Sequence, residues 1–188
     1  MVWTQCVESR PLAAERVACF PHAGGSPYFF RGWGKALDRF EVHAVCYPGR
    51  AERIAEPPCT ALVPMARHIA DELRPMMEER PTTLFGHSMG AVVAYEVARA
   101  LEAGGTRVGH LFASGARAPQ LMRATLVELG QTDAELLRNP AFMELVMPYI
   151  AADFRMLAAY EGEGRTPLDC PVTALLGASD PRVSAGLP

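Results

Sequence analysis

Short apolar runs alternate along the chain with longer stretches of helical periodicity. Five of these runs have the length and apolar character of buried strands: 16–20, 41–47, 82–85, 108–113 and 172–176. Three of the intervening segments fit helices, at about 27–38, 61–79 and 89–103. This alternation predicts an α/β fold, in which a parallel sheet carries helices on both of its faces.

The segment 121–160 interrupts the alternation between the fourth and fifth predicted strands. Its apolar residues recur at helical spacing and no run resembles a strand, so we expect two or three helices there. Asp153 lies among these helices and is expected to be a solvated or lid residue. The segment also holds four of the nine methionines, namely Met122, Met143, Met147 and Met156.

The length of 188 residues fits one domain spanning 1–188. Hydrophobic residues make up 49% of the chain and charged residues 21%, which supplies a sizeable core and excludes a disordered or fibrous protein. The net charge is −3 and no basic block stands out. Neither a nucleic acid nor a membrane surface is therefore indicated as a partner.

The cysteines are five in number, and no CxxC pair or cysteine–histidine cluster occurs. This usage favours a reducing compartment and argues against a disulfide framework or a zinc site, so we expect no metal. Residues 1–10 lack the pattern of a signal peptide, and no apolar stretch reaches the ~18 residues of a membrane span. We expect a cytoplasmic protein.

The sharpest local feature is the sequence Gly86-His87-Ser88-Met89-Gly90, which fits the pattern G-x-S-x-G. A predicted strand precedes it and a predicted helix follows, which is the context of a nucleophile elbow. The two glycines let strand and helix pass closely, and Ser88 would project into a cleft. The alternative is a glycine-rich turn with an incidental serine.

An acyl-transfer serine also needs donors for the developing oxyanion. The backbone N–H of Met89, directly after the serine, is one candidate. The second is the N–H of Ala23, because Pro21-His22-Ala23-Gly24-Gly25 follows the first predicted strand. The alternative is a plain Gly-Gly turn leading into a helix.

Asp180 is the candidate acid, because it comes just after the last predicted strand and so can reach the edge of the sheet where Ser88 lies. The alternative is an aspartate that only forms a turn before Pro181. Asp169 comes before the same strand and therefore lies at the wrong end.

Six motifs occur together in a recognisable order: Phe20–Gly25, Tyr47–Arg50, Gly86–Gly90, Ser114–Pro119, Ala152–Arg155 and Gly177–Pro181. The combination resembles the type II, or editing, thioesterases of polyketide and nonribosomal peptide synthesis, over about residues 12–183. The resemblance implies an α/β-hydrolase fold: a mostly parallel sheet with flanking helices and a helical lid, about 121–160, inserted before the last visible strand.

In such enzymes the residues matching Ser88 and Asp180 are the nucleophile and the acid of the triad. Those matching Ala23 and Met89 supply the oxyanion hole. The implied activity is hydrolysis of acyl groups from the phosphopantetheine arm of an acyl or peptidyl carrier protein, for editing or release. No cofactor is implied beyond the phosphopantetheine of the substrate. We expect the enzyme to be a monomer.

The triad order Ser, Asp, His calls for a histidine after Asp180, whereas all five histidines precede it. We therefore expect the natural polypeptide to continue past Pro188 with another strand, a loop bearing a histidine, and a closing helix. Otherwise one of the five visible histidines is the base, and His22 is the first to test.

Within the lid, apolar side chains that adapt their shape suit acyl chains of different form. We expect one or two of five such side chains to line the acyl chamber. The alternative is that these side chains only pack the lid onto the sheet. The five are Met122, Phe142, Met143, Met147 and Phe154.

Two rival functions fit part of this pattern. A general esterase, lipase or acyltransferase would share the elbow at Ser88, and a panel of thioesters beside oxyesters distinguishes it. A non-catalytic carrier-binding scaffold fits the missing histidine, but it would not require the elbow, the oxyanion loop and Asp180.

Overall fold

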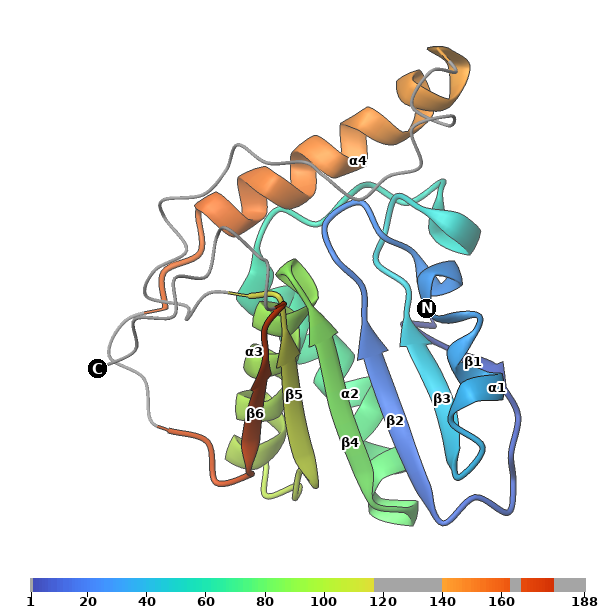
Figure 1. The fold of residues 1–188 in the computed structure, drawn as a ribbon. Coiled ribbons are helices and arrows are strands. Elements are labelled where there is room, and N and C mark those ends of the chain that lie inside the picture. The colour runs from blue at the N-terminus through green and yellow to red at the C-terminus, as the bar shows by residue number, and fades with distance from the viewer. Residues whose placement is uncertain (1, 117–139, 163–166, 178–188) are drawn as a thin grey trace.

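A single sheet organises the molecule. The computed structural model describes residues 2–116, 140–162 and 167–177, and of residues 140–143 the backbone alone. The sheet has six strands in the order β1-β3-β2-β4-β5-β6 (Figure 1). Their bounds are Thr4–Glu8, Glu15–Phe20, Phe40–Val45, Thr82–His87, His110–Ser114 and Val172–Leu175 for β1 to β6. All neighbours are parallel except β1, which runs antiparallel to β3.

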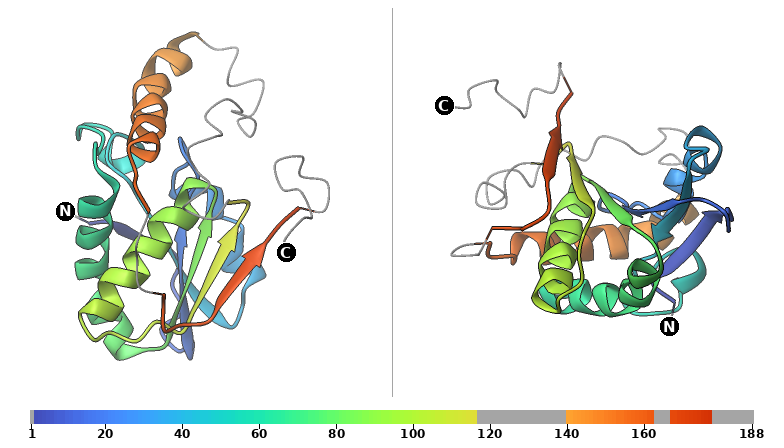
Figure 2. Two further views of the ribbon diagram at one scale, coloured as in Figure 1. Left: turned by 90° about the vertical axis from the view of Figure 1, so that its left-hand side faces the viewer. Right: turned by 90° about the horizontal axis from the view of Figure 1, so that it is seen from below.

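Two long helices, α2 (Leu62–Glu79) and α3 (Met89–Ala103), cover one face of the sheet (Figure 2). In α2 the buried residues recur every three or four positions, so they form one stripe that packs against the sheet and α3. In α3 most residues are buried. The main core therefore lies between these helices and the strands.

A smaller core lies on the opposite face of the sheet. There Phe30, from the 3₁₀ helix η1 (Pro27–Phe30), packs with Val17, Cys19 and Val42 of the sheet. The short helix α1 (Trp33–Ala36) continues this cover, and the Trp33 ring meets Phe85 of β4 at 4.6 Å. Helices thus flank both faces, as the alternation of elements predicts.

The five predicted strands are confirmed as β2 to β6, and two of the three helices as α2 and α3. The helix expected over 27–38 is wrong, because η1 and α1 divide it. Gly32 and Gly34 fall in this stretch, and glycine disfavours a continuous helix. Gly34 also lies where a Cβ would come 2.6 Å from Glu8 Cβ. The strand β1 was not expected at all.

Helix α4 (Pro140–Ala158) belongs to the inserted segment, whose residues 121–139 lie outside the described residues. It crosses above the carboxyl ends of the strands (Figure 1). Its own residues Val146, Ile150 and Asp153 are buried, as is Tyr160 just beyond its end. None of the helices in the described ranges combines the length and apolar character needed to cross a bilayer.

Candidate active site

Ser88 lies on a strained turn between β4 and α3. Its φ of 54° and ψ of −120° fall where a residue with a side chain is rarely found. Two hydrogen bonds hold the turn: the Ser88 N–H donates to the Ser114 carbonyl at 2.8 Å, and the Ala91 N–H donates to the Ser88 carbonyl at 3.0 Å. This backbone is the sharp strand-to-helix elbow that the glycine spacing predicts.

The glycines on either side of Ser88 lie where side chains cannot fit. A Cβ at Gly86 would overlap the backbone of Gly90 and Ala91, and a Cβ at Gly90 would overlap the carbonyl oxygen of Phe20. The start of α3 therefore touches the end of β2. The same contact brings Ser88 and Met89 beside the loop that follows β2.

That loop comprises residues 21–25, and the amides of its two glycines have acceptors. The Gly24 N–H donates to Asp153 Oδ2 at 2.8 Å, and the Gly25 N–H donates to the His22 carbonyl at 2.8 Å. Among the described residues, no acceptor is found for the amides of Ala23 and Met89. In the described part of the chain, both amides that the sequence selects as oxyanion donors are therefore open.

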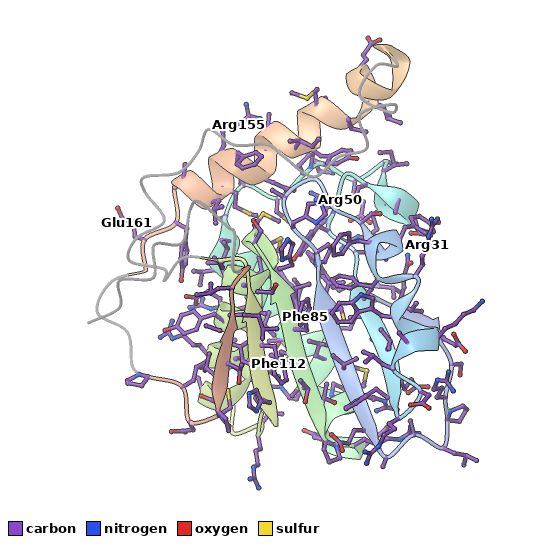
Figure 3. The ribbon with its side chains drawn as sticks, viewed as in Figure 1. Arg31, Arg50, Phe85, Phe112, Arg155 and Glu161 are labelled. Atoms are coloured by element: carbon purple, nitrogen blue, oxygen red, sulfur yellow. The ribbon has the colours of Figure 1, made fainter. Side chains whose placement is uncertain are left out.

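Arg50 and Asp153 form a buried ion pair above the 21–25 loop. Arg50 Nη1 lies 2.6 Å from Asp153 Oδ2, and Nη2 lies 2.7 Å from Oδ1. The two residues are 2% and 3% exposed. Figure 3 shows Arg50 between α4 and the upper ends of the strands, whereas Arg155 points away from them. Of the two readings expected for Asp153, the solvated one is wrong, because this residue of α4 is buried against the Arg50 guanidinium.

Tyrosines complete the surroundings of this pair. The Arg50 guanidinium lies 5.2 Å from the Tyr47 ring and 4.8 Å from the Tyr149 ring. Burial raises the pKa of Tyr47 well above its ordinary value, so the phenol stays neutral and donates to the Pro21 carbonyl at 3.3 Å. The 21–25 loop is thus held at both of its ends.

Two histidines, His22 and His87, lie close to the elbow. The His87 ring meets Ser114 Oγ at 3.2 Å and lies 6.0 Å from the His22 ring. The His22 ring meets Phe29 edge-on at 4.8 Å. Burial, and then the nearby charges of His87 and Arg50, lower the pKa of His22, so its imidazole is neutral at pH 7.

The other three histidines have partners away from Ser88. His43 lies 3.3 Å from Glu41 on β3, His68 stacks on Trp3, and His110 lies 2.8 Å from Thr173 Oγ1. The expectation that the base follows Asp180 in the chain stays a prediction, because Asp180 itself lies outside the described residues.

One group of side chains has the atoms of a metal site. In Cys6, Glu41 and His43 the potential ligand atoms lie within 4.8 Å of one another. However, Glu41 already binds the Arg16 guanidinium at 2.9 Å, and Arg80 lies 3.7 Å away. These cations already neutralise the carboxylate, so the group serves the joint between β1 and β3. All five cysteines are free thiols.

The residues expected in the acyl chamber are only partly described. Met122 lies outside the described residues, and of Phe142 and Met143 only the backbone is described. Met147 is 40% exposed on α4, and Phe154 is half-buried. Helix α4 lies directly on the loop beside the elbow, because a Cβ at Gly24 would come 2.7 Å from Ile150 Cγ1.

A serine on a strained elbow, beside two open amides at the carboxyl edge of a mostly parallel sheet, defines an α/β-hydrolase. Comparison with known families narrows this class further. Residues 15–187 match the Thioesterase domain family, and the chain belongs to that family. It is therefore a thioester hydrolase.

Relatives and solved structures agree with this assignment. The thioesterase PikA5 of Streptomyces venezuelae is 37% identical over 96% of this chain and 70% of its own length. The type II thioesterase BorB of the borrelidin cluster has a TM-score of 0.83 at 34% identity, over 97% of this chain and 78% of that one. The synthetase AmbE of Pseudomonas aeruginosa is 38% identical over 90% of this chain, which spans 9% of AmbE.

Proposed function

We propose that this protein hydrolyses acyl thioesters held on the phosphopantetheine arm of an acyl or peptidyl carrier protein, with Ser88 as the nucleophile. The observation that carries the proposal is the strained turn at Ser88 beside the open amides of Ala23 and Met89. The similarity to PikA5 and BorB supports the choice of substrate. An editing or release role follows from that choice.

In the proposed reaction, Ser88 Oγ attacks the thioester carbonyl carbon while its proton passes to a histidine base. The amides of Ala23 and Met89 donate to the carbonyl oxygen as it becomes an oxyanion. Collapse of this intermediate breaks the C–S bond and expels the pantetheine thiol, which takes up the proton. Water then attacks the acyl-serine, and the free acid and Ser88 are released.

Asp180 is proposed to orient the base, which the triad order places after it in the chain. The reactants are a thioester, a serine and water, so the proposal calls for no metal or redox cofactor. The remaining lid candidates, Met122, Phe142, Met143, Met147 and Phe154, are proposed to include one or two that contact the acyl chain.

Replacement of Ser88 tests the nucleophile. In the full-length protein, Ser88→Ala should lower kcat by several powers of ten with little change in the unfolding midpoint. It should also abolish labelling by a fluorophosphonate probe. Ser9→Ala, at an exposed serine remote from the elbow, is the control and should keep both. Turnover by Ser88→Ala within tenfold of the parent contradicts the assignment.

A substrate panel tests the substrate class. Acyl thioesters of a carrier protein and of free pantetheine are compared with oxyesters of the same acyl groups. We expect the thioesters to be preferred, with a higher kcat/KM when the carrier protein is present. A preference for oxyesters favours a general esterase instead. Absence of both turnover and fluorophosphonate labelling favours a binding scaffold, because the probe reports an activated serine.

A further inference from the structure

The Arg50–Asp153 pair is costly to build and is placed beside the elbow. Both side chains are removed from water, and buried ion pairs of this kind contribute little net stability compared with apolar residues of the same size. The two residues come from distant parts of the chain, the loop after β3 and helix α4. A contribution to the stability of the fold therefore does not by itself explain why the pair is there.

The pair also binds the backbone of the 21–25 loop. Asp153 Oδ2 accepts the Gly24 N–H at 2.8 Å in addition to Arg50, so one oxygen joins both partners. Arg50 Nη1 also lies 3.3 Å from the Gly25 carbonyl oxygen. Together the two side chains bind the N–H of Gly24 and the carbonyl oxygen of Gly25.

These contacts fix the conformation of the residue after Ala23. Gly24 has a φ of 75°, which glycine adopts readily, and unrestrained glycine moves between several conformations. The Asp153 carboxylate and the Ile150 side chain hold it in this one. Because the Gly24 amide belongs to the peptide that begins at Ala23, holding it limits rotation of the neighbouring Ala23 N–H.

We infer that Arg50 and Asp153 are positioning residues that hold the 21–25 loop so that the Ala23 N–H faces the reacting carbonyl. This inference rests on the proposed function, in which that N–H stabilises the oxyanion. It makes the geometry of the oxyanion hole depend on where α4 sits, because Asp153 belongs to that helix. The simpler alternative is that the pair only anchors α4.

The two roles separate in a variant that keeps the packing but removes the polar atoms. Arg50→Met with Asp153→Leu replaces the pair by apolar groups of similar volume, a change that buried ion pairs often tolerate. The matched control is Arg16→Met with Glu41→Leu. That pair is also buried, at 2.9 Å, but it lies near the amino ends of β2 and β3.

The readouts are kcat and KM for an acyl-pantetheine thioester, the unfolding midpoint, and the rate of fluorophosphonate labelling. We expect the Arg50/Asp153 double variant to lose at least about tenfold in kcat, since loss of one oxyanion donor costs about a hundredfold or more. KM should stay within threefold. The control should keep kcat within threefold even where its midpoint falls. An Arg50/Asp153 variant that folds and keeps its parent kcat overturns the inference.

Asp153→Asn keeps the inference testable if the double variant does not fold. A single amide oxygen cannot serve the three donors that the carboxylate now accepts, so kcat should fall at least about fivefold at unchanged KM. A parent-like kcat in this variant overturns the inference.

Failure of the proposed function is seen separately, as a parent without thioesterase activity or a Ser88→Ala variant that retains it. The labelling rate then still reports on the pair, because phosphonylation of Ser88 also develops an oxyanion. A tenfold slower labelling of the double variant supports the inference, and an unchanged rate overturns it.

Discussion

Ser88 adopts one of two left-handed backbone conformations found at non-glycine residues in the described part of the chain. Such a conformation costs about 1–3 kcal/mol and persists only where the surroundings impose it. Here the surroundings are the bond to the Ser114 carbonyl and the contact between Gly90 and the end of β2. These two backbone contacts therefore hold Ser88 in the elbow conformation.

Gly90→Ala tests this at one position. The added methyl group would overlap the Phe20 carbonyl, which is backbone and cannot move aside, so we expect a loss of more than about 2 kcal/mol in the free energy of unfolding. Gly32→Ala is the control: it meets nothing within 4 Å and should change stability by less than about 0.5 kcal/mol. Denaturant titration of both variants measures the difference, and equal losses would contradict the close approach.

Helix α4 shows how one element serves several neighbours. Ile150 and Asp153 contact the 21–25 loop, and just beyond the helix Tyr160 donates to Glu96 of α3 at 2.5 Å. Met147 and Phe154 are seven residues apart and so share a stripe beside the buried one. That stripe is the part of the described lid in which contact with an acyl chain is proposed.

Phe154→Ala tests the role of this stripe. If Phe154 contacts the acyl chain, its removal should lower kcat/KM for a long-chain thioester at least about tenfold more than for an acetyl thioester, since burying one large apolar side chain contributes about 1.5 kcal/mol or more. Leu145→Ala is the control, because Leu145 is 57% exposed on the same helix. Equal losses for both chain lengths would argue that Phe154 only attaches the lid.

At the scale of the whole molecule, two buried ion pairs of the described residues lie at opposite ends of the sheet. The Arg50–Asp153 pair lies at the carboxyl ends of the strands, and Arg16 and Glu41 lie near the amino ends of β2 and β3. Arg16 also binds the Met76 carbonyl of α2 at 2.7 Å. The second group therefore ties a helix to the sheet far from the elbow.

This second group predicts an acid-sensitive stability. Burial alone would raise the pKa of Glu41, but the Arg16 guanidinium and the Arg10 amide outweigh it and lower that pKa to about 2. Because the folded-state pKa lies below the ordinary value, the ionised carboxylate stabilises the fold above about pH 4.5. That contribution, on the order of 3 kcal/mol, should be lost as pH falls from about 4.5 toward 2.

Urea unfolding at a series of pH values measures the effect. Glu41→Gln should be less stable than the parent near neutral pH and should flatten the decline on the acid side. Glu78→Gln, which removes an exposed carboxylate, is the matched control. A Glu41→Gln variant with the parent's acid profile would contradict the role given to this carboxylate.

The elements found from the sequence are those whose cause is local. The apolar runs of β2 to β6, the stripe of α2 and the glycines around Ser88 each specify their structure within a few residues. The strand β1 has no such run, since its side chains are exposed or half-buried at an edge, and it forms because β3 offers a partner.

The elbow and its two amides were likewise predictable, because motif, strand and helix are contiguous. The fold alone decided the partners of the loop that carries Ala23. Arg50 and Asp153 are 103 residues apart, and each reads locally as an ordinary charged residue. Only chain topology brings α4 over the end of β3, and only there does removal from water pair the two charges and bind them to Gly24.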